Sequence, residues 1–392
     1  MADAQTCLRE ALAAQTNTAP GDWHLVLKCR HGMLVVLREL AQRYGKGTVI
    51  TQLLTCCTAV DPIVAAGLTP VYGDVSLQTF ALDAAALRVS EPPVAIVDQH
   101  TFGYIDRASS QALRAVANSH SALLLEDCAH CVGRMATDDQ GRPLADFSFH
   151  SFGVEKMLPT YFGGAVWVNP QMEDAKLRDK VTQALESLPE PQGKLARAMR
   201  GYRTQIRALN HLPAPLSRGV RSTLLALEAF EPAIAECERK GAIAHEPQAA
   251  GEWAASQVVD LFEALPNSYD LRISALDSYA QELSDIEGIG TSQAMLASGQ
   301  PLLRVPVNMA SNEAANAAIQ AIASAGLYAV PWYRPLLYPG VSDKGAYAWD
   351  GTLQNLPHTA ALSHGAVALP CDLTKAQVHN VACALREAAS AT

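Results

Sequence analysis

The sequence predicts an α/β protein in which a mostly parallel sheet carries helices on both faces. Two observations support this prediction. Short apolar runs alternate with segments of helical periodicity, and one buried-type run, residues 122–125, ends in Glu126 and Asp127. Open α/β sheets bind their ligands at the carboxyl ends of the strands. We therefore expect a ligand site beside Asp127.

Strands and helices alternate through the first half of the chain. Residues 1–20 are expected to form an N-terminal helix or arm, and residues 31–44 a helix, because their apolar side chains follow helical spacing. The next helix is expected to end near Gly67, a residue typical of helix C-termini. The remaining elements are expected as strands at 48–51, 70–75, 93–98, 122–127 and 147–152 and as a helix at 111–118.

The second half of the chain is predicted to be richer in helices. Residues 175–245 are expected to form a helical insertion or a segment facing a second subunit, and two long helices, at 254–265 and 273–283, are expected to join two domains. The C-terminal part is expected to place a helix, 313–326, between strands at 302–307 and 328–331.

These segments predict three parts: an N-terminal arm over residues 1–20, a large domain over 21–260 that contains the helical insertion, and a smaller C-terminal α/β domain over 261–392.

Composition limits the class of protein. The chain has 392 residues, of which 49% are hydrophobic and 18% charged, as expected for a globular protein. Its formal net charge of −9 argues against a general nucleic-acid surface. No apolar run approaches the length of a membrane span, and the first twenty residues lack the apolar core of a signal peptide. We expect a cytoplasmic protein.

Nine cysteines are scattered along the sequence without an even framework, which indicates reduced thiols. Cys128 and Cys131 form a C-x-x-C pair around His130. A zinc or redox role for this pair is the less favoured interpretation, because no second C-x-x-C or spaced histidine pair accompanies it. We expect no metal site and interpret the pair as small side chains that pack beside a strand end.

A second apolar run, residues 147–152, leads to Lys156 and then to Gly163 and Gly164. Pyridoxal 5′-phosphate requires a lysine amine for its Schiff base, an acid against its pyridine nitrogen and hydrogen-bond donors for its phosphate. Lys156 suits the first role, Asp127 the second, and the Ser151 hydroxyl part of the third. The alternatives are a surface lysine and an acid that caps a helix.

These residues resemble the DegT/DnrJ/StrS family of sugar aminotransferases, which have the aspartate-aminotransferase fold (fold type I). The family shows E-D-x-x-[QH], S-F-x-x-x-K and G-G-A in this order. The corresponding residues here are Glu126–His130, Ser151–Lys156 and Gly163–Ala165. The resemblance implies a large domain with a mostly parallel sheet, a small C-terminal domain and a homodimer with sites at the subunit interface.

The resemblance also suggests further cofactor-binding residues. His130 matches a family position near the cofactor ring, although a core histidine is the alternative. The family's phosphate loop aligns with residues 29–33, where its usual hydroxyl is missing; Arg30 and the backbone N–H groups of His31, Gly32 and Met33 are expected to hold the phosphate instead. The aromatic residue that usually stacks on the ring is replaced near Cys56.

The predicted function is that of a pyridoxal-phosphate-dependent aminotransferase, with Lys156 as the catalytic acid and base. The resemblance implies glutamate or glutamine as amino donor and a keto group on a nucleotide-linked sugar as acceptor. One alternative is a sugar dehydratase that uses the same cofactor, but that branch replaces the lysine with histidine. Another is a non-catalytic regulator or scaffold, which the altered phosphate loop would favour.

Overall fold

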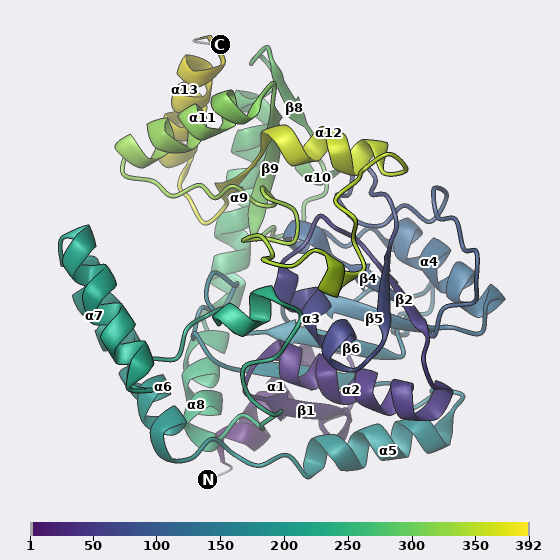
Figure 1. Ribbon diagram of the computed structural model, residues 1–392. Helices are drawn as coiled ribbons and strands as arrows, with labels where there is room; N and C mark the ends of the chain where they lie inside the picture. The colour runs from purple at the N-terminus through teal and green to yellow at the C-terminus, as the bar shows by residue number, and fades with distance from the viewer. Residues whose placement is uncertain (1–2, 391–392) are drawn as a thin grey trace.

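The computed structural model describes residues 3–390, which form two sheets with helices around them (Figure 1). The larger sheet has seven strands in the order β1-β7-β6-β5-β4-β2-β3. The five strands β3, β2, β4, β5 and β6 are parallel to their neighbours in this order, and β7 is antiparallel to both of its neighbours, β6 and β1. The predicted mostly parallel sheet is therefore confirmed. Its strands are β1 (Trp23–Val26), β2 (Thr48–Thr51), β3 (Thr69–Tyr72), β4 (Ala95–Gln99), β5 (Leu123–Cys128), β6 (Phe147–Ser151) and β7 (Gly164–Val168).

Helices cover both faces of the large sheet, as predicted. Alternate strand residues point to opposite faces: Ile96 and Leu124 pack with α4 (Arg107–Ser119) on one side, whereas Val97 and Leu125 belong to the main core on the other. The other helices of this half are α1 (Ala4–Thr16), α2 (Cys29–Tyr44), α3 (Cys57–Ala65) and α5 (Ala175–Glu186), with short 3₁₀ turns at Pro20–Asp22 and Thr101–Gly103.

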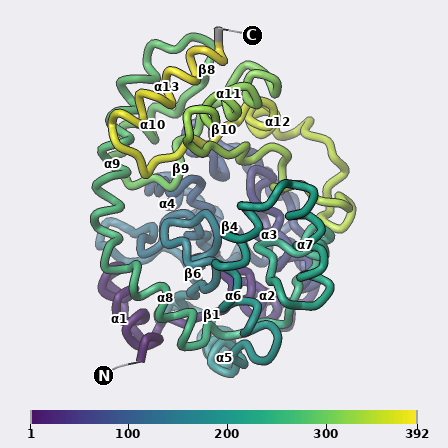
Figure 2. Tube along the Cα trace, turned by 90° about the vertical axis from the view of Figure 1, so that its left-hand side faces the viewer, coloured from purple at the N-terminus to yellow at the C-terminus, as the bar shows by residue number. Residues whose placement is uncertain are grey.

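The smaller sheet has three antiparallel strands in the order β10-β9-β8 and lies in the upper part of Figure 1. Figure 2 shows the same C-terminal region with α13 and α11 near its outer end. The elements here are β8 (Ile289–Thr291), β9 (Arg304–Met309), β10 (Ala366–Pro370), α9 (Leu265–Glu282), α10 (Gln293–Leu296), α11 (Asn312–Ser324), α12 (Pro357–Gly365) and α13 (Lys375–Ser390).

The segment between the two sheets is helical, as predicted. It contains α6 (Gly193–Asn210), α7 (Ala214–Ala226), a 3₁₀ turn at Glu236–Arg239 and α8 (Glu252–Phe262). In Figure 1, α7 projects away from the rest of the molecule, and none of its residues is buried. Among residues 3–390, no helix has both the length and the apolar character needed to cross a membrane.

The predicted strand at 328–331 is wrong. Only Val330 pairs there, in an isolated bridge with Ala368. Pro331 has no backbone N–H to continue a ladder, and the chain runs instead through Trp332 and Tyr333 toward α3, with a 3₁₀ turn following at Gly345–Tyr347. The strand that pairs with β9 on this side is β10, which the sequence pattern did not identify.

Candidate active site

One cavity lies at the carboxyl ends of β4, β5 and β6 and at the N-terminus of α2. Counted out to its open mouth, its volume is about 1210 Å³. Seven of the nine cofactor-binding residues expected from the sequence line it: Arg30, Met33, Cys56, Asp127, His130, Ser151 and Lys156. The fold therefore brings together residues from four separate segments of the chain, which is a requirement for a common ligand site.

Asp127 lies at the end of β5, where the strand reaches the cavity. Its side chain is buried, and its Oδ1 accepts a hydrogen bond from the Ala129 amide at 2.9 Å. Burial raises the pKa of Asp127, while the bond from Ala129 and the charge of Lys156 oppose that rise. A buried carboxylate in this position is suited to face a protonated ring nitrogen.

Lys156 lies on the loop between β6 and β7, and this loop is fixed by backbone hydrogen bonds at its base. The Phe152 amide donates to Gly163 O at 3.0 Å, and the Gly163 amide donates to Leu27 O at 2.7 Å. The half-buried Lys156 points its Nζ over the Trp332 ring, 5.8 Å from the ring centroid. Its amine is therefore held inside the cavity by an anchored loop.

Gly164 allows β7 to lie against the start of α2. A Cβ at this position would lie 2.8 Å from Cys29 N and 2.9 Å from both Cys29 Cα and His150 O. These are backbone atoms and cannot move aside as a side chain would. The Gly-Gly pair of the sequence motif therefore places the N-terminus of α2 directly beside the lysine loop.

His130 lies between Phe102, which follows β4, and the aromatic pair Trp332 and Tyr333 of the C-terminal half. Its Nδ1 accepts a hydrogen bond from the Phe102 amide at 3.1 Å, so a neutral ring carries its proton on Nε2, which lies 3.4 Å from Tyr333 Oη. Burial, Lys156 and Arg304 hold its pKa well below the usual value. The ring stacks on Trp332 with 5.3 Å between centroids and planes 6° apart. His130 is thus a neutral, oriented hydrogen-bond donor.

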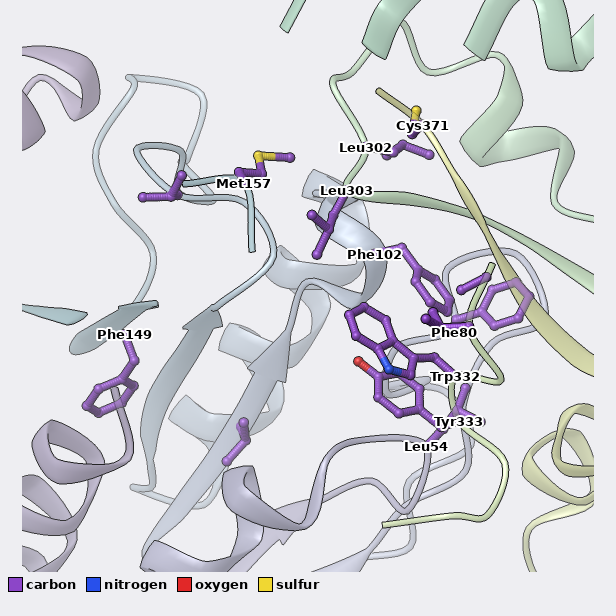
Figure 3. Packing of buried hydrophobic residues seen from close by; sticks show 14 of the residues in the cluster. Leu54, Phe80, Phe102, Phe149, Met157, Leu302, Leu303, Trp332, Tyr333 and Cys371 are labelled. Carbon is purple, nitrogen blue, oxygen red and sulfur yellow. The ribbon is translucent and has the colours of Figure 1, made fainter. Parts of the chain in front are cut away.

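Trp332 and Tyr333 were not identified from the sequence. Both are buried, both line the cavity, and Figure 3 shows them beside Phe102 and Phe80. They come from the C-terminal half, and the only available signal was an aromatic pair flanked by prolines. This segment therefore supplies aromatic side chains to the cavity, together with Tyr161, Phe162 and Tyr202, whereas the position of Cys56 supplies none.

Cys56 is the residue that precedes α3, and it accepts a hydrogen bond from Thr58 Oγ1 at 3.0 Å. The hydrogen bond from Cys57 lowers the pKa of the Cys56 thiol, with further help from Thr58 and Lys156, although burial opposes this. Tyr338 lies beside Cys56, because the amide of the next residue, Cys57, donates to Tyr338 O at 2.9 Å. A thiol with enhanced acidity therefore faces the cavity.

His31 and Gly32 do not line the cavity. His31 is fully buried, and its Nδ1 accepts from the Gln248 amide at 3.1 Å. A Cβ on Gly32 would lie 2.2 Å from the Val166 side chain, so this residue packs against β7. Since α2 begins at Cys29 and the His31 amide already donates to Lys28 O at 2.9 Å, the free helix N–H groups lie earlier in the chain than expected.

Two buried ion pairs lie at this end of the cavity. Arg30 Nε is 2.7 Å from Glu238, and its Nη2 donates to Ala233 O. Lys28 is paired with Glu231, whose other oxygen is 2.9 Å from His245 Nε2. Sequence reasoning missed Lys28 and Glu231, because nothing local in the sequence indicates that residues 203 positions apart form a pair.

A buried hydrogen-bond network centres on Glu126, the residue that precedes Asp127 on β5. His100 Nε2 lies 2.7 Å from Glu126 Oε1, and Glu126 also accepts from Ser148 and from the Ala136 amide. Burial alone would lower the pKa of His100. Nearby acids, which include Asp98, raise this pKa to about 10. His100 and Glu126 therefore form a charged pair that fixes the end of β5.

His100, Glu126 and Cys128 also place three possible metal-ligand atoms within 4.8 Å of one another. Both oxygens of Glu126 already accept hydrogen bonds from protein groups. Hydrogen bonding therefore accounts for the cluster without an ion.

The donor set fits pyridoxal phosphate. The cavity offers a lysine amine, a buried carboxylate at a strand end and the N-terminus of α2, which no side chain caps. Lys156 and Asp127 suit the reactive carbon and the ring nitrogen, and the uncapped helix N-terminus with the Ser151 hydroxyl suits a phosphate.

Comparison with known proteins finds a family similar to the first half of the chain. Residues 26–211 match the model of the DegT/DnrJ/EryC1/StrS aminotransferase family. This segment of the chain is similar to that family. The matched residues include Asp127, Ser151 and Lys156, so the family segment contains the residues at the centre of the cavity.

Two curated relatives in sugar biosynthesis match part of the chain. GDP-perosamine synthase of Caulobacter vibrioides is 31% identical over 156 residues, which cover 39% of this chain and 42% of that protein. Spore coat polysaccharide biosynthesis protein SpsC of Bacillus subtilis is 30% identical over 159 residues, covering 40% of this chain and 39% of SpsC. The match thus spans about two fifths of the length of these relatives.

The fold extends over the whole chain. Helicobacter pylori PseC, an aminotransferase involved in pseudoaminic acid biosynthesis, has a similar structure with a TM-score of 0.71 and 17% identity. The similarity covers 100% of this chain and 92% of PseC. The expected fold type I architecture is therefore confirmed, and it includes the C-terminal half.

Proposed function

We propose that the chain is a pyridoxal-phosphate-dependent aminotransferase that transfers an amino group from glutamate to the keto group of a nucleotide-linked sugar. The observation that carries this proposal is the convergence of Lys156, Asp127 and His130 on one cavity in the family fold. The acceptor class follows from the relatives, one of which is named as the synthase of a GDP-linked amino sugar.

The bound cofactor would supply an electron sink for the carbon that gains or loses the amino group. The chain's own residues would position it and move protons. Lys156 would hold the cofactor covalently and then transfer a proton to and from the reacting carbon. Asp127 would keep the ring nitrogen protonated, and the neutral His130 would donate a hydrogen bond from Nε2 near the ring.

Lys156→Ala and Lys156→Arg test this proposal. Both variants are expected to lose the Lys156-dependent visible absorption band of the bound cofactor and to lower turnover by about 10³-fold or more, because no other amine replaces the proton carrier. The band is recorded on purified protein with added cofactor, and turnover is measured as 2-oxoglutarate release from glutamate in the presence of a nucleotide-linked keto sugar.

Lys344→Ala is the matched control, since Lys344 stacks on Trp349 outside the cavity. Full turnover in Lys156→Ala would eliminate the proposed mechanism. Cofactor binding without any 2-oxoglutarate release in the wild type would instead favour a non-catalytic protein, the second candidate.

We further propose a homodimer. Residues 193–227, the α6–α7 hairpin, contain seven Lys or Arg residues and no Asp or Glu. The net charge of the chain is −9, so the remaining residues carry −16 against the +7 of this hairpin. Leu216 on α7 and Leu227 directly after it are 53% and 63% exposed. A basic hairpin with exposed leucines complements the acidic surface of a second copy.

We also propose a division into an N-terminal arm (1–20), a large domain (21–260) and a small domain (261–392), since each sheet falls within one of the two larger parts. A cytoplasmic location is supported by the cysteines, all nine of which are free.

A further inference from the structure

The phosphate end of the cavity contains a buried lysine that neither the family pattern nor the sequence analysis assigns to the site. Lys28 immediately precedes α2 and is 8% exposed. Its Nζ donates to Glu231 and, at 3.4 Å, to Pro232 O. Both Lys28 and Glu231 line the cavity. An ammonium and a carboxylate therefore face the same space as the uncapped helix N-terminus.

The requirements of a phosphate group explain why this pair matters. A phosphate monoester carries a charge of about −1.5 to −2 at neutral pH and needs several strong donors. The N-terminus of a helix supplies only about half a positive charge, and the hydroxyl that usually assists in this family is missing from residues 29–33. Lys28 is the cation that immediately precedes these helix N–H groups, and Arg30 is the cation within the first turn.

Arg30 does not meet the same requirement. Its guanidinium is bonded to Glu238 and to Ala233 O, and Glu238 in turn accepts from the Ala235 amide at 2.8 Å. Glu238 is completely buried and does not line the cavity. Arg30 lines the cavity, but its acidic partner does not, whereas both Lys28 and Glu231 face the ligand space.

We propose that Lys28 binds the phosphate of the cofactor and that Glu231 competes with that phosphate for the Lys28 ammonium. This inference rests on the proposed function. Glu231 has a second partner in His245, whose Nε2 lies 2.9 Å away and whose side chain is 32% exposed. Glu231 therefore keeps a hydrogen bond when Lys28 turns to the phosphate, and the exchange leaves no buried carboxylate without a partner.

The proposed competition predicts opposite changes of cofactor affinity in two variants. Lys28→Met removes the ammonium but keeps the length of the side chain, and we expect the dissociation constant for pyridoxal phosphate to rise about tenfold or more, as for a lost charge-assisted hydrogen bond. Glu231→Gln removes the competing charge while keeping a group that bonds His245 and Lys28. We expect its dissociation constant to fall about tenfold. The double variant should resemble Lys28→Met.

Binding is measured on cofactor-free protein by equilibrium dialysis against pyridoxal phosphate, and again with inorganic phosphate as competitor. Glu246→Gln is the matched control, because Glu246 pairs with Arg38 at the surface nearby and should leave both constants unchanged. Lys28→Arg keeps a cation and should retain at least part of the affinity. Thermal denaturation with and without inorganic phosphate provides a second measurement: phosphate should raise the melting temperature most in Glu231→Gln and least in Lys28→Met.

Unchanged phosphate competition in folded Lys28→Met, or weaker binding in folded Glu231→Gln, would overturn the inference. Its failure is distinguishable from failure of the proposed function. The Lys156-dependent absorption band, measured with pyridoxal that lacks the phosphate, reports on the lysine and ring end alone, whereas inorganic phosphate reports on the Lys28 end alone.

Discussion

At the scale of single residues, the position of a side chain at a strand end accounts for much of the candidate site. Asp127 is buried because it ends β5, and Lys156 enters the cavity because its loop is anchored to Leu27. Both features follow from local sequence order, because Asp127 lies on a strand and Lys156 follows the end of the next strand at a fixed distance in the sequence. Spacing along one strand–loop unit therefore predicted these two residues.

Cys56 leads to a prediction about thiol chemistry. The hydrogen bond from Cys57 lowers the pKa of Cys56 below the ordinary value, whereas the pKa of Cys57 is raised by the same bond and by burial. The thiolate is the reactive form, so iodoacetamide at pH 7 is expected to modify Cys56 before Cys57. The rate should rise with pH and level off below the pH at which an ordinary thiol ionises.

Peptide mass spectrometry after timed alkylation measures both sites in one sample. Cys57→Ala removes the donor and is expected to slow alkylation of Cys56 several-fold, while Cys57→Ser keeps a hydroxyl donor and should slow it less. Equal labelling of Cys56 and Cys57 in the wild type would contradict the assigned direction of the two pKa shifts.

Other residues of the site were beyond sequence reasoning for a physical reason. Lys28 and Glu231 meet only because the segment after α7 folds back to the start of α2. Trp332 reaches His130 only because residues 332–338 pack against the residues that precede α3. The backbone phosphate donors were expected at His31, Gly32 and Met33 from a helix start at residue 31, and α2 begins at Cys29 instead. Long-range contacts and helix starts have no strong local signature.

At the scale of elements, the close contact between β7 and α2 depends on Gly164. In Gly164→Ala, the new Cβ would meet backbone atoms of Cys29 and His150 at 2.8–2.9 Å. We expect α2 to shift and the protein to lose about 1–3 kcal/mol of stability, the usual range for overpacking. Cofactor affinity should fall as well, since the shift moves the helix N-terminus.

Gly219→Ala is the control for this prediction. Gly219 lies within α7, where nothing lies within 4 Å of an added Cβ. Alanine is expected to stabilise this exposed helix by about 1 kcal/mol. Thermal denaturation and cofactor titration of both variants make the comparison. A Gly164→Ala protein with wild-type melting temperature and affinity would show that β7 and α2 have room to separate.

Elements whose apolar pattern matches their surroundings were predicted well, and the others were not. The strand at 48–51 has the expected bounds, and the neighbouring parallel strands agree within a few residues. Residues 328–331 have the composition of a strand, but the tertiary position of Trp332 and the missing amide of Pro331 prevented ladder formation. Local propensity there was overridden by packing.

At the scale of the whole molecule, the proposed dimer predicts a measurable mass. Light scattering after gel filtration should give about twice the chain mass of 41.8 kDa. Leu216→Gln combined with Leu227→Gln should shift the population toward the monomer, because these leucines are among the most exposed apolar side chains of the protein.

Leu77→Gln is the matched control, since Leu77 is 41% exposed but lies outside the α6–α7 hairpin. A monomeric mass for the wild type at micromolar concentration would contradict the dimer. A dimer that resists the double substitution but not higher salt would place the interface on the charged residues of the hairpin instead.

The return of the C-terminal segment to α3 has a consequence for the synthesis of the protein. The Tyr338 amide donates to Thr55 O at 2.8 Å, the Leu337 amide donates to Leu53 O at 3.0 Å, and Trp332 covers His130. A chain still growing on the ribosome can pair its first strands early, but it lacks this wall of the cavity until Tyr338 has emerged. Nascent chains shorter than this would expose Lys156 without enclosing it, so capture of the cofactor is expected to follow translation of the C-terminal sheet.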